Sequence, residues 1–149
     1  MENNKIRITK QFAFEAAHAL ENYEGRCRFI HGHSYVLHVT LTGIPCDDEN
    51  DPGNGMVTDF GIIKKIVDDN IINRFDHSLI LRHDSVFRVD EIEKHGKIEI
   101  TDFRPTCENM LTYFVTILKD KLPHGTELFA MRLHETATSY AEWFAEDQK

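Results

Sequence analysis

Two stretches in which apolar and polar residues alternate constrain the fold of this chain more than any other feature. Residues 5–16 carry apolar side chains at alternate positions, interrupted at Lys10, and residues 31–43 repeat the alternation. Side chains two apart in a strand point to one face, so each stretch predicts a half-buried strand. The apolar positions of the two predicted faces are Ile6, Ile8, Phe12, Phe14, Ala16, Tyr35, Leu37, Val39 and Leu41.

Two helical patterns lie beyond these strands. Asp59 is a candidate N-cap, and apolar residues recur at helical spacing from Ile62 to Ile71, which predicts an amphipathic helix of about four turns. Thr106 is a candidate N-cap for a second helix, whose apolar stripe begins at Cys107. Turn-forming residues fill positions 44–55, between the second strand and the first helix.

The remaining strands are shorter. A strand candidate lies at residues 97–101, and a longer one at residues 127–136, where Leu128 is expected on the face opposite Met131 and Glu135. The tail after residue 136 adds a turn or a short strand. Strands, helix, irregular excursion, helix and strand give an α+β fold, with antiparallel hairpins and two helices on one face.

Composition bounds the class of protein. A length of 149 residues, 41% of them hydrophobic, predicts one domain over residues 1–149. The net charge of −8 argues against nucleic-acid binding, which needs a basic surface. No apolar run approaches the roughly 20 residues that span a bilayer, and the N-terminus lacks a secretory signal, so no membrane association and a cytoplasmic location are expected. Three widely spaced cysteines do not indicate a disulfide framework.

Three histidines are candidate metal ligands. His31 and His33 are two apart in a predicted strand and therefore share a face, and antiparallel pairing brings His18 across from them. Three imidazoles with one open position are the usual arrangement of a catalytic zinc site. The alternative is that histidines at strand ends are solvated surface residues, and spacing alone leaves both interpretations open.

Cys27 and the Asp76–His77 pair are candidates for proton transfer. Cys27 lies in a loop between Arg26 and Arg28, and positive charge favours the reactive thiolate; the alternative is an inert buried cysteine. An aspartate can fix the tautomer of a histidine and raise its basicity. The dipeptide is otherwise a turn aspartate followed by a surface histidine, and alone it is a weak signal.

Glu135 stands on an otherwise apolar face of the last predicted strand. A carboxylate there needs a partner, because burying an unpaired charge is costly. One suitable partner is a heterocycle edge with two parallel N–H groups, which a carboxylate binds bidentately. The alternative is a glutamate at a strand end that has emerged into water.

Six sequence blocks, in order and over most of the chain, resemble the 6-pyruvoyl-tetrahydropterin synthase and 6-carboxy-5,6,7,8-tetrahydropterin synthase superfamily. They are FEAAH at 14–18, CRFIHGHSY at 27–35, GMVTDFGIIK at 55–64, FDH at 75–77, PTCEN at 105–109 and HETATSYAEW at 134–143. The resemblance implies the tunnelling fold, with a four-stranded antiparallel sheet and two helices in each subunit. It also implies that three sheets close into a barrel, that two trimers form a homohexamer, and that active sites lie at subunit interfaces.

The resemblance also implies roles for matching residues. His18, His31 and His33 would bind Zn²⁺, and Cys27 would be the general base. Asp76 and His77 would relay a proton, from a neighbouring subunit. Glu135 would hold the pterin edge, with help from Thr106 and Glu108. No triphosphate-binding motif is visible, and Arg26, Arg28 and Lys97 are candidates only.

The implied substrate is 7,8-dihydroneopterin triphosphate, and the superfamily has two main branches. One releases triphosphate and acetaldehyde to leave 6-carboxy-5,6,7,8-tetrahydropterin, on the route to queuosine; the other eliminates triphosphate to leave a pyruvoyl side chain. The three-residue gap between Cys27 and the HGH motif is similar to the carboxy-forming enzymes, as is TATSYAEW. A zinc lyase of the carboxy type is the leading hypothesis, ahead of the pyruvoyl type, an aldolase-like relative or a non-catalytic pterin-binding module.

Two departures from the pattern bear on substrate choice. FDHSLIL lacks the Asn that often follows Asp-His in short bacterial members. Residues 82–104 form a longer segment than in those members and contain His83 and His95. This segment is expected to border the pocket.

Overall fold

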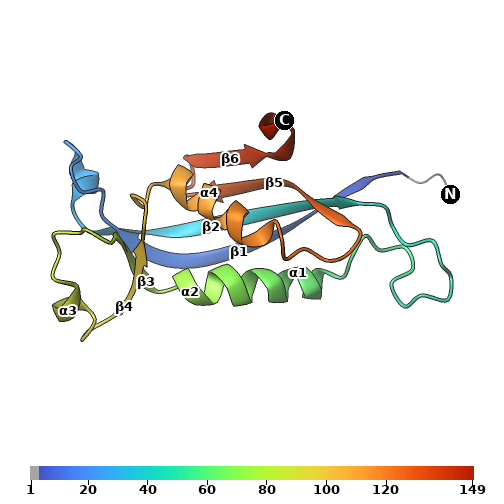
Figure 1. Cartoon of the computed structure of the whole chain (residues 1–149), viewed down its shortest axis with the longest axis horizontal. Helices are drawn as coiled ribbons and strands as arrows, with labels where there is room; N and C mark the ends of the chain where they lie inside the picture. The colour runs from blue at the N-terminus through green and yellow to red at the C-terminus, as the bar shows by residue number, and fades with distance from the viewer. Residues whose placement is uncertain (1–3) are drawn as a thin grey trace.

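Two long antiparallel strands form the centre of the structure, a computed structural model that describes residues 4–149. β1 (Ile6–His18) and β2 (His31–Gly43) pair along their whole length, with Ile6 opposite Gly43 and His18 opposite His31. They run along most of the length of the molecule (Figure 1). Alternate side chains of both strands are buried, as the sequence predicts.

The sheet has six strands, in the order β4-β3-β1-β2-β5-β6. β5 (Thr126–His134) and β6 (Tyr140–Phe144) extend the antiparallel pair on one side. β3 (Ser78–Arg82) and β4 (Lys97–Thr101) add two short parallel strands on the other. The expected four-stranded sheet is therefore wrong in its number of strands, although β1, β2, β5 and β6 do form a four-stranded antiparallel unit.

Long connections explain the two additional strands. A parallel neighbour needs a crossover of about a dozen residues or more, which a hairpin turn cannot supply. The helical segment at residues 60–75 leads into β3, and the connection between β3 and β4 contains the short helix α3 (Val89–Ile92). The segment at residues 82–104 thus contains the crossover between β3 and β4. The apolar and polar alternation of such short strands does not show whether they pair in parallel.

A β-bulge in β5 corrects the predicted faces of this strand. Thr40 lies opposite Ala130 and Leu41 lies opposite Leu128, so Phe129 is the additional residue. Leu128 is buried together with Met131, rather than on the opposite face as alternation predicts. Beyond the bulge, Met131 and Leu133 face the core, and the same alternation directs Glu135 to that side.

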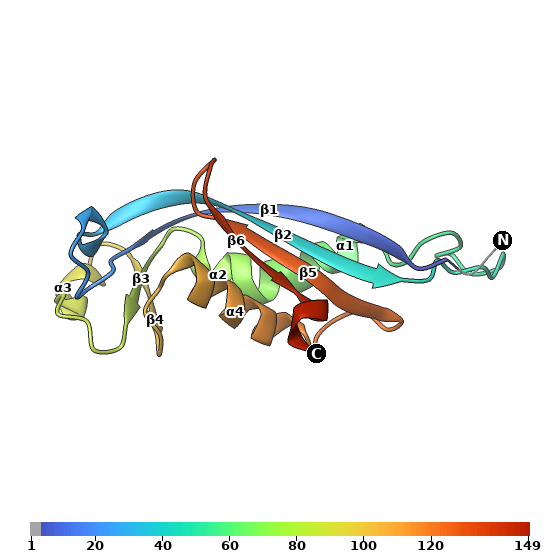
Figure 2. The same cartoon turned by 90° about the horizontal axis from the view of Figure 1, so that it is seen from above.

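The helices cover one face of the sheet (Figure 2). A continuous helical segment consists of α1 (Phe60–Val67), a π-helical turn η2 (Asp68–Ile72) and α2 (Asn73–Phe75), which confirms the predicted four turns. α4 (Cys107–Leu118) lies beside it. Short 3₁₀ helices are η1 (Arg26–Arg28) and η3 (Ala145–Gln148). No helix in the described part of the chain combines the length and apolarity needed to cross a membrane.

The core lies between this helical layer and the sheet. Its largest fully buried side chains are Phe14, Tyr35, Leu37, Leu41, Ile63, Ile71, Phe75, Ile80, Leu81, Met110, Phe114 and Leu118. The helix-free face is polar by comparison: Thr9 pairs with Thr40, and Gln11 pairs with His38, across β1 and β2. The curved sheet therefore has one sealed face and one polar face, a shape that suits association with further copies.

The Asp59 side chain is the N-cap of α1 and accepts a hydrogen bond from the Gly61 backbone N–H at 2.6 Å. We expect Asp59→Ala to lower the free energy of unfolding by about 1 kcal/mol, because one helix N–H loses its partner. Asp69→Ala is the control, since its ion pair with Lys65 is exposed to water and contributes little to stability. Urea denaturation measures both, and equal losses would contradict the capping role.

Candidate metal centre and active site

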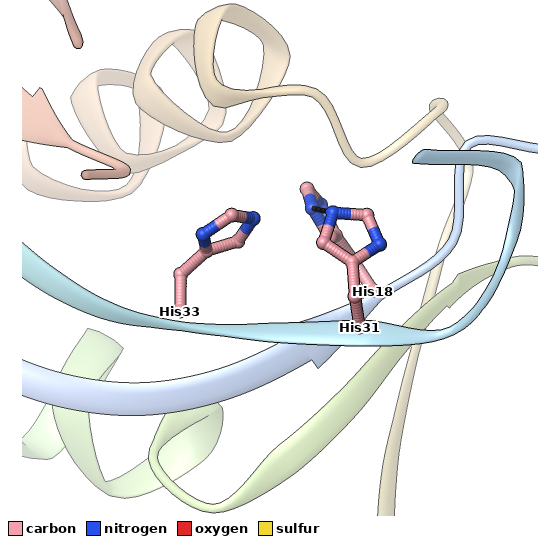
Figure 3. A group of neighbouring side chains, drawn as sticks. All are labelled: His18, His31 and His33. Carbon is pink, nitrogen blue, oxygen red and sulfur yellow. Dashed lines mark hydrogen bonds between the residues drawn. The ribbon is translucent and has the colours of Figure 1, made fainter. Parts of the chain in front are cut away.

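Three imidazole rings converge at one end of the central strand pair (Figure 3). His18 ends β1 and lies opposite His31, while His33 is two residues further along β2 on the same face. The ring centroids lie 4.6 Å apart for His18 and His31, 5.1 Å for His18 and His33, and 4.9 Å for His31 and His33. One nitrogen from each ring lies within 4.8 Å of the others, so the three could hold one metal ion.

Backbone carbonyls orient two of these rings. His18 Nδ1 donates to the carbonyl of Pro105 at 2.7 Å, and His31 Nδ1 donates to the carbonyl of Phe29 at 2.8 Å. A carbonyl can only accept, so the proton of each neutral ring is on Nδ1 and its Nε2 carries a lone pair. The two Nε2 atoms face each other at 3.0 Å. A second ring nitrogen bonded to a carbonyl is the usual support of a metal-binding histidine.

Burial disfavours the charged form of two of these rings. It lowers the pKa of His18 to about 4, with help from the neighbouring imidazoles, and it lowers the pKa of His33 as well. His33 Nε2 is buried and has no hydrogen-bond partner among residues 4–149. Neutral imidazoles with converging lone pairs repel one another weakly, and a cation between them removes that repulsion. The donor set therefore fits a metal ion better than it fits an apolar or solvated cluster.

Glu135 adds a carboxylate to the same centre. Its Oε1 lies 3.6 Å from His18 Nε2 and 3.8 Å from His33 Nε2. Glu135 follows β5 directly, and its side chain is 26% exposed, so it is neither deeply buried nor free in water. Of the two sequence interpretations, the structure favours a carboxylate that is directed into the site.

A cavity of about 300 Å³ joins four of the predicted site residues. Cys27, Thr106, Glu108 and Glu135 all line it. The remaining lining residues are Leu20, Tyr23, Cys107, Ser139, Tyr140 and Ala141. Of the residues that the structure describes, two carboxylates and no lysine or arginine line this cavity, so it suits a ligand that presents N–H donors. The Thr106 hydroxyl also caps α4, where it accepts from the Asn109 N–H.

The two cysteines of this cavity differ in environment. Cys107 is buried, its thiol lies 3.2 Å from the carbonyl of Leu133, and burial raises its pKa to about 11. Cys27 lies in η1 and is only partly buried. The flanking arginines suggested by the sequence do not line the cavity, and Arg28 instead packs over the ring of Phe29. Cys27 is therefore the thiol that is accessible to a ligand. The expected stabilisation of its thiolate by the flanking arginines is not seen.

Asp76 and His77 form a side-chain pair, although they are adjacent in sequence. The turn after α2 makes this possible, because His77 adopts a left-handed backbone with φ of 58°. Asp76 Oδ1 lies 2.9 Å from His77 Nδ1 and accepts the Glu15 backbone N–H, also at 2.9 Å. This backbone hydrogen bond, with His77 beside it, holds the pKa of Asp76 below its usual value.

This pair does not meet Cys27 within one subunit. His77 lines a hollow of about 460 Å³ together with Glu15 and Ser34, and this hollow reaches His33 but not Cys27. Glu15 and Ser34 are opposite each other in β1 and β2, one residue removed from Ala16 and His33, so their side chains lie on the other face of the sheet. The structure therefore brings together the three histidines, Cys27, Thr106, Glu108 and Glu135, and leaves Asp76 and His77 apart.

Comparison with known proteins shows the family of this chain. The family model described as 6-pyruvoyl tetrahydropterin synthase matches residues 7–146. The chain belongs to this family. A protein of Rickettsia felis named 6-carboxy-5,6,7,8-tetrahydropterin synthase is 34% identical, over 92% of this chain and 99% of that protein. A protein of Haemophilus influenzae with the same name is 32% identical, over 93% and 98%.

A solved structure shows the same fold. The 6-pyruvoyl tetrahydropterin synthase of Caenorhabditis elegans superposes with a TM-score of 0.65 at 24% identity, over 95% of this chain and 96% of that one. At this identity the likeness concerns the fold alone, which is the tunnelling fold expected from the sequence.

The segment at residues 82–104 borders the hollow of His77, rather than the Cys27 cavity. Ile92, Gly96 and Lys97 line that hollow. Lys97 Nζ donates to the carbonyls of Asn73 at 2.7 Å and of Asp76 at 3.2 Å, so it fastens the turn before β3. Lys97 is therefore engaged within the chain, which weakens its candidacy as a triphosphate ligand.

Sequence reasoning missed the groups that support the metal centre. The carbonyls of Phe29 and Pro105 fix two imidazoles, but a backbone carbonyl leaves no signature in side-chain patterns. Tyr35 was expected only as a core residue, yet its ring lies 5.5 Å from that of His33 and its hydroxyl lies 3.4 Å from His18 Nδ1. Its position two residues after the HGH motif, on the same face, is the signal that could have identified it.

Proposed function

We propose that this chain is a zinc-dependent lyase that converts 7,8-dihydroneopterin triphosphate to 6-carboxy-5,6,7,8-tetrahydropterin, with release of acetaldehyde and triphosphate. The observation that carries this proposal is the three-histidine centre adjoining an acidic cavity that contains Cys27. Family members about one third identical over nearly their full length, including that of Rickettsia felis, have the matching name. The three-residue gap between Cys27 and the HGH motif supports the carboxy-forming branch over the pyruvoyl-forming one.

Zinc is the metal that these ligands suit best. His18, His31 and His33 offer three neutral nitrogens, the donor type that zinc accepts in catalytic sites with a fourth position left for substrate. A bound zinc would supply Lewis-acid polarisation of the hydroxyl and carbonyl oxygens of the substrate side chain. The hydrogen bonds from His18 and His31 to backbone carbonyls hold the ligands in the tautomer that zinc requires.

The acidic cavity is the proposed pterin site. The 2-amino and N3 groups of a pterin form a guanidine-like edge, and a carboxylate binds two parallel N–H donors bidentately. Glu135 supplies that carboxylate, while Glu108 and Thr106 line the same cavity and add acceptors. The cavity adjoins the three histidines at Glu135, whose Oε1 lies 3.6 Å from His18 Nε2 and 3.8 Å from His33 Nε2.

Proton transfer is assigned to Cys27 and to the Asp76–His77 pair. Cys27 as thiolate removes a proton from the substrate side chain, and His77 returns one. Asp76 holds the His77 ring by its Nδ1, which leaves Nε2 for proton exchange. Since the pair does not meet the Cys27 cavity of its own chain, we assign it to the site of a neighbouring subunit in a homohexamer.

Metal removal tests the lyase assignment. We expect chelated, dialysed protein to stop releasing triphosphate from 7,8-dihydroneopterin triphosphate. Added zinc should restore the release, and full activity should be reached at about one zinc ion per chain. Calcium chloride serves as the control addition, because three imidazole nitrogens do not suit a cation that prefers oxygen ligands. Equal turnover by stripped and reloaded protein would refute a metal-dependent reaction, and no turnover in either state would favour a non-catalytic pterin-binding module.

Subunit mixing tests the composite site. Cys27→Ala and His77→Ala should each be inactive, because each lacks one partner in proton transfer. If each site combines two subunits, unfolding and refolding an equal mixture should restore about a quarter of wild-type activity, since a quarter of sites would pair two intact partners. Each variant refolded alone is the control. A mixture as inactive as its components would place both residues in one subunit's site.

A further inference from the structure

Three arginines line a cavity of about 350 Å³ that is distinct from the acidic cavity of Cys27. Arg28 comes from η1, and Arg82 and Arg104 come from the two ends of the segment at residues 82–104. η1 and the connection that contains α3 lie at the same end of the molecule (Figures 1 and 2). The fold therefore gathers guanidinium groups from distant parts of the sequence around one hollow, the arginine cavity.

The charge of the arginine cavity is only partly balanced. Arg82 forms an ion pair with Asp84, and the Glu21 carboxylate accepts a backbone N–H at 2.7 Å. Neither Arg28 nor Arg104 forms an ion pair with a carboxylate in the part of the chain that the structure describes. Three arginines against two carboxylates leave this cavity positive, in a chain whose net charge is −8.

Arg104 has N–H groups that lack acceptors. Its Nε is buried and has no hydrogen-bond partner within residues 4–149, and its Nη2 donates to the Leu20 carbonyl at 3.3 Å. The guanidinium carbon also lies 5.7 Å from the centroid of the Tyr23 ring. A buried donor without an acceptor is costly, and the planar fork of an arginine binds phosphate through two N–H groups at once. An anion in the cavity would supply the missing acceptors.

The arginine cavity adjoins the metal centre. Phe29 and Pro105 both line it. The Phe29 carbonyl lies 2.8 Å from His31 Nδ1, and the Pro105 carbonyl lies 2.7 Å from His18 Nδ1. The backbone that orients two candidate metal ligands thus also forms a wall of this cavity.

The acidic cavity begins directly beyond the same segments. Cys27 and Thr106 line the acidic cavity, and each is next in sequence to a residue that lines the arginine cavity. Leu20 and Tyr23, which Arg104 contacts, line the acidic cavity too. One cavity that suits N–H donors and one that suits an anion therefore lie side by side next to the three histidines.

We propose that the arginine cavity is a polyphosphate-binding site, in which Arg28 and Arg104 bind phosphate oxygens. Arginine suits this role because it stays charged and its fork matches phosphate geometry. Two unpaired guanidinium groups favour a ligand with several negative charges over a single carboxylate. The ligand is the triphosphate end of the substrate or a free polyphosphate, and the first of these sources rests on the proposed function.

Calorimetric titration with inorganic triphosphate tests the site without any turnover. Arg28→Gln and Arg104→Gln should each lower the affinity for triphosphate roughly 10- to 100-fold, the usual effect of losing hydrogen bonds to a charged group. The Arg28 side chain is exposed, so its variant remains informative if Arg104→Gln folds poorly. Arg88→Gln is the matched control, because it removes the same charge from residues 82–104 without lining the cavity. Equal affinities in wild type, Arg28→Gln and Arg104→Gln, or an equal loss in Arg88→Gln, would overturn the proposal.

Triphosphate also chelates zinc, so the titration is repeated on His31→Ala protein. Binding should persist there, and its loss would overturn the proposal by showing that the metal holds the triphosphate. Binding through the arginines in a protein that does not turn over 7,8-dihydroneopterin triphosphate would refute the proposed function and leave the polyphosphate site standing.

Steady-state kinetics identify the source of the polyphosphate. If the triphosphate of the substrate occupies the site, Arg104→Gln should raise KM for 7,8-dihydroneopterin triphosphate roughly 10- to 100-fold and leave the affinity for unsubstituted pterin unchanged. Inorganic triphosphate should then inhibit competitively. An unchanged KM with non-competitive inhibition would contradict a role in substrate binding and assign the site to a free polyphosphate.

Discussion

His31→Ala protein is expected to purify without stoichiometric zinc and to show no measurable turnover of 7,8-dihydroneopterin triphosphate. The substitution removes one of the three candidate nitrogen ligands, the His31 Nε2 that lies 3.0 Å from His18 Nε2. Even the loss of groups that merely orient metal ligands costs roughly 10- to 100-fold in metal affinity, so the loss of a ligand should cost more. Metal analysis and the rate of triphosphate release measure the two effects on one sample.

His38→Ala is the matched control for this variant. His38 is on the same strand, but its position in the alternation places it on the helix-free face, where it pairs with Gln11. It should keep zinc and activity. His31 is a better choice than His18, which is fully buried, because alanine at His18 would also leave a cavity in the core. A His31→Ala protein that retains one zinc per chain would show that the histidines do not form the metal site.

Cys27→Ala is expected to keep its zinc and to lose turnover by roughly 100-fold or more, the usual contribution of a positioned general base. Cys27 lines the cavity beside Glu135 but is absent from the cluster of converging metal ligands. Zinc content, circular dichroism and rate together measure the effect. Cys107→Ala is the informative comparison: its thiol has its pKa raised to about 11 by burial, so it does not serve as a base near pH 7.

Two results would contradict this role for Cys27. If Cys27→Ala loses zinc as well as activity, the thiol is a metal ligand and the loss of turnover says nothing of proton transfer. If Cys27→Ala turns over at the wild-type rate while Cys107→Ala does not, the base has been assigned to the wrong cysteine. The two cysteines line one cavity, so the comparison holds the surroundings nearly constant.

Local patterns predict the long strands and the convergence of the three histidines well because one geometric rule governs both. Alternation places Tyr35 and Leu37 in the core and continues to His33 and His31, and full-length antiparallel pairing then sets His18 opposite His31. The caps of α1 and α4 are equally local, since a side chain at the N-cap reaches only the next few N–H groups.

Features that depend on long-range pairing escaped the same reasoning. β3 and β4 are five residues each, and their parallel pairing is determined by crossovers that a short pattern does not report. The bulge at Phe129 inverts the alternation of β5, so Leu128 faces the core. The proximity of Glu135 to the histidines also depends on β5 pairing with β2, which brings residues about one hundred positions apart into contact.

The products of a single reaction test the central proposal most directly. Zinc-loaded protein is incubated with 7,8-dihydroneopterin triphosphate, and acetaldehyde, triphosphate and the pterin product are quantified in the same sample. The proposed function predicts acetaldehyde and triphosphate in equal amounts, together with 6-carboxy-5,6,7,8-tetrahydropterin. Triphosphate without acetaldehyde would contradict it and assign the chain to the pyruvoyl-forming branch, and 6-hydroxymethyldihydropterin formed from dihydroneopterin would indicate an aldolase-like relative.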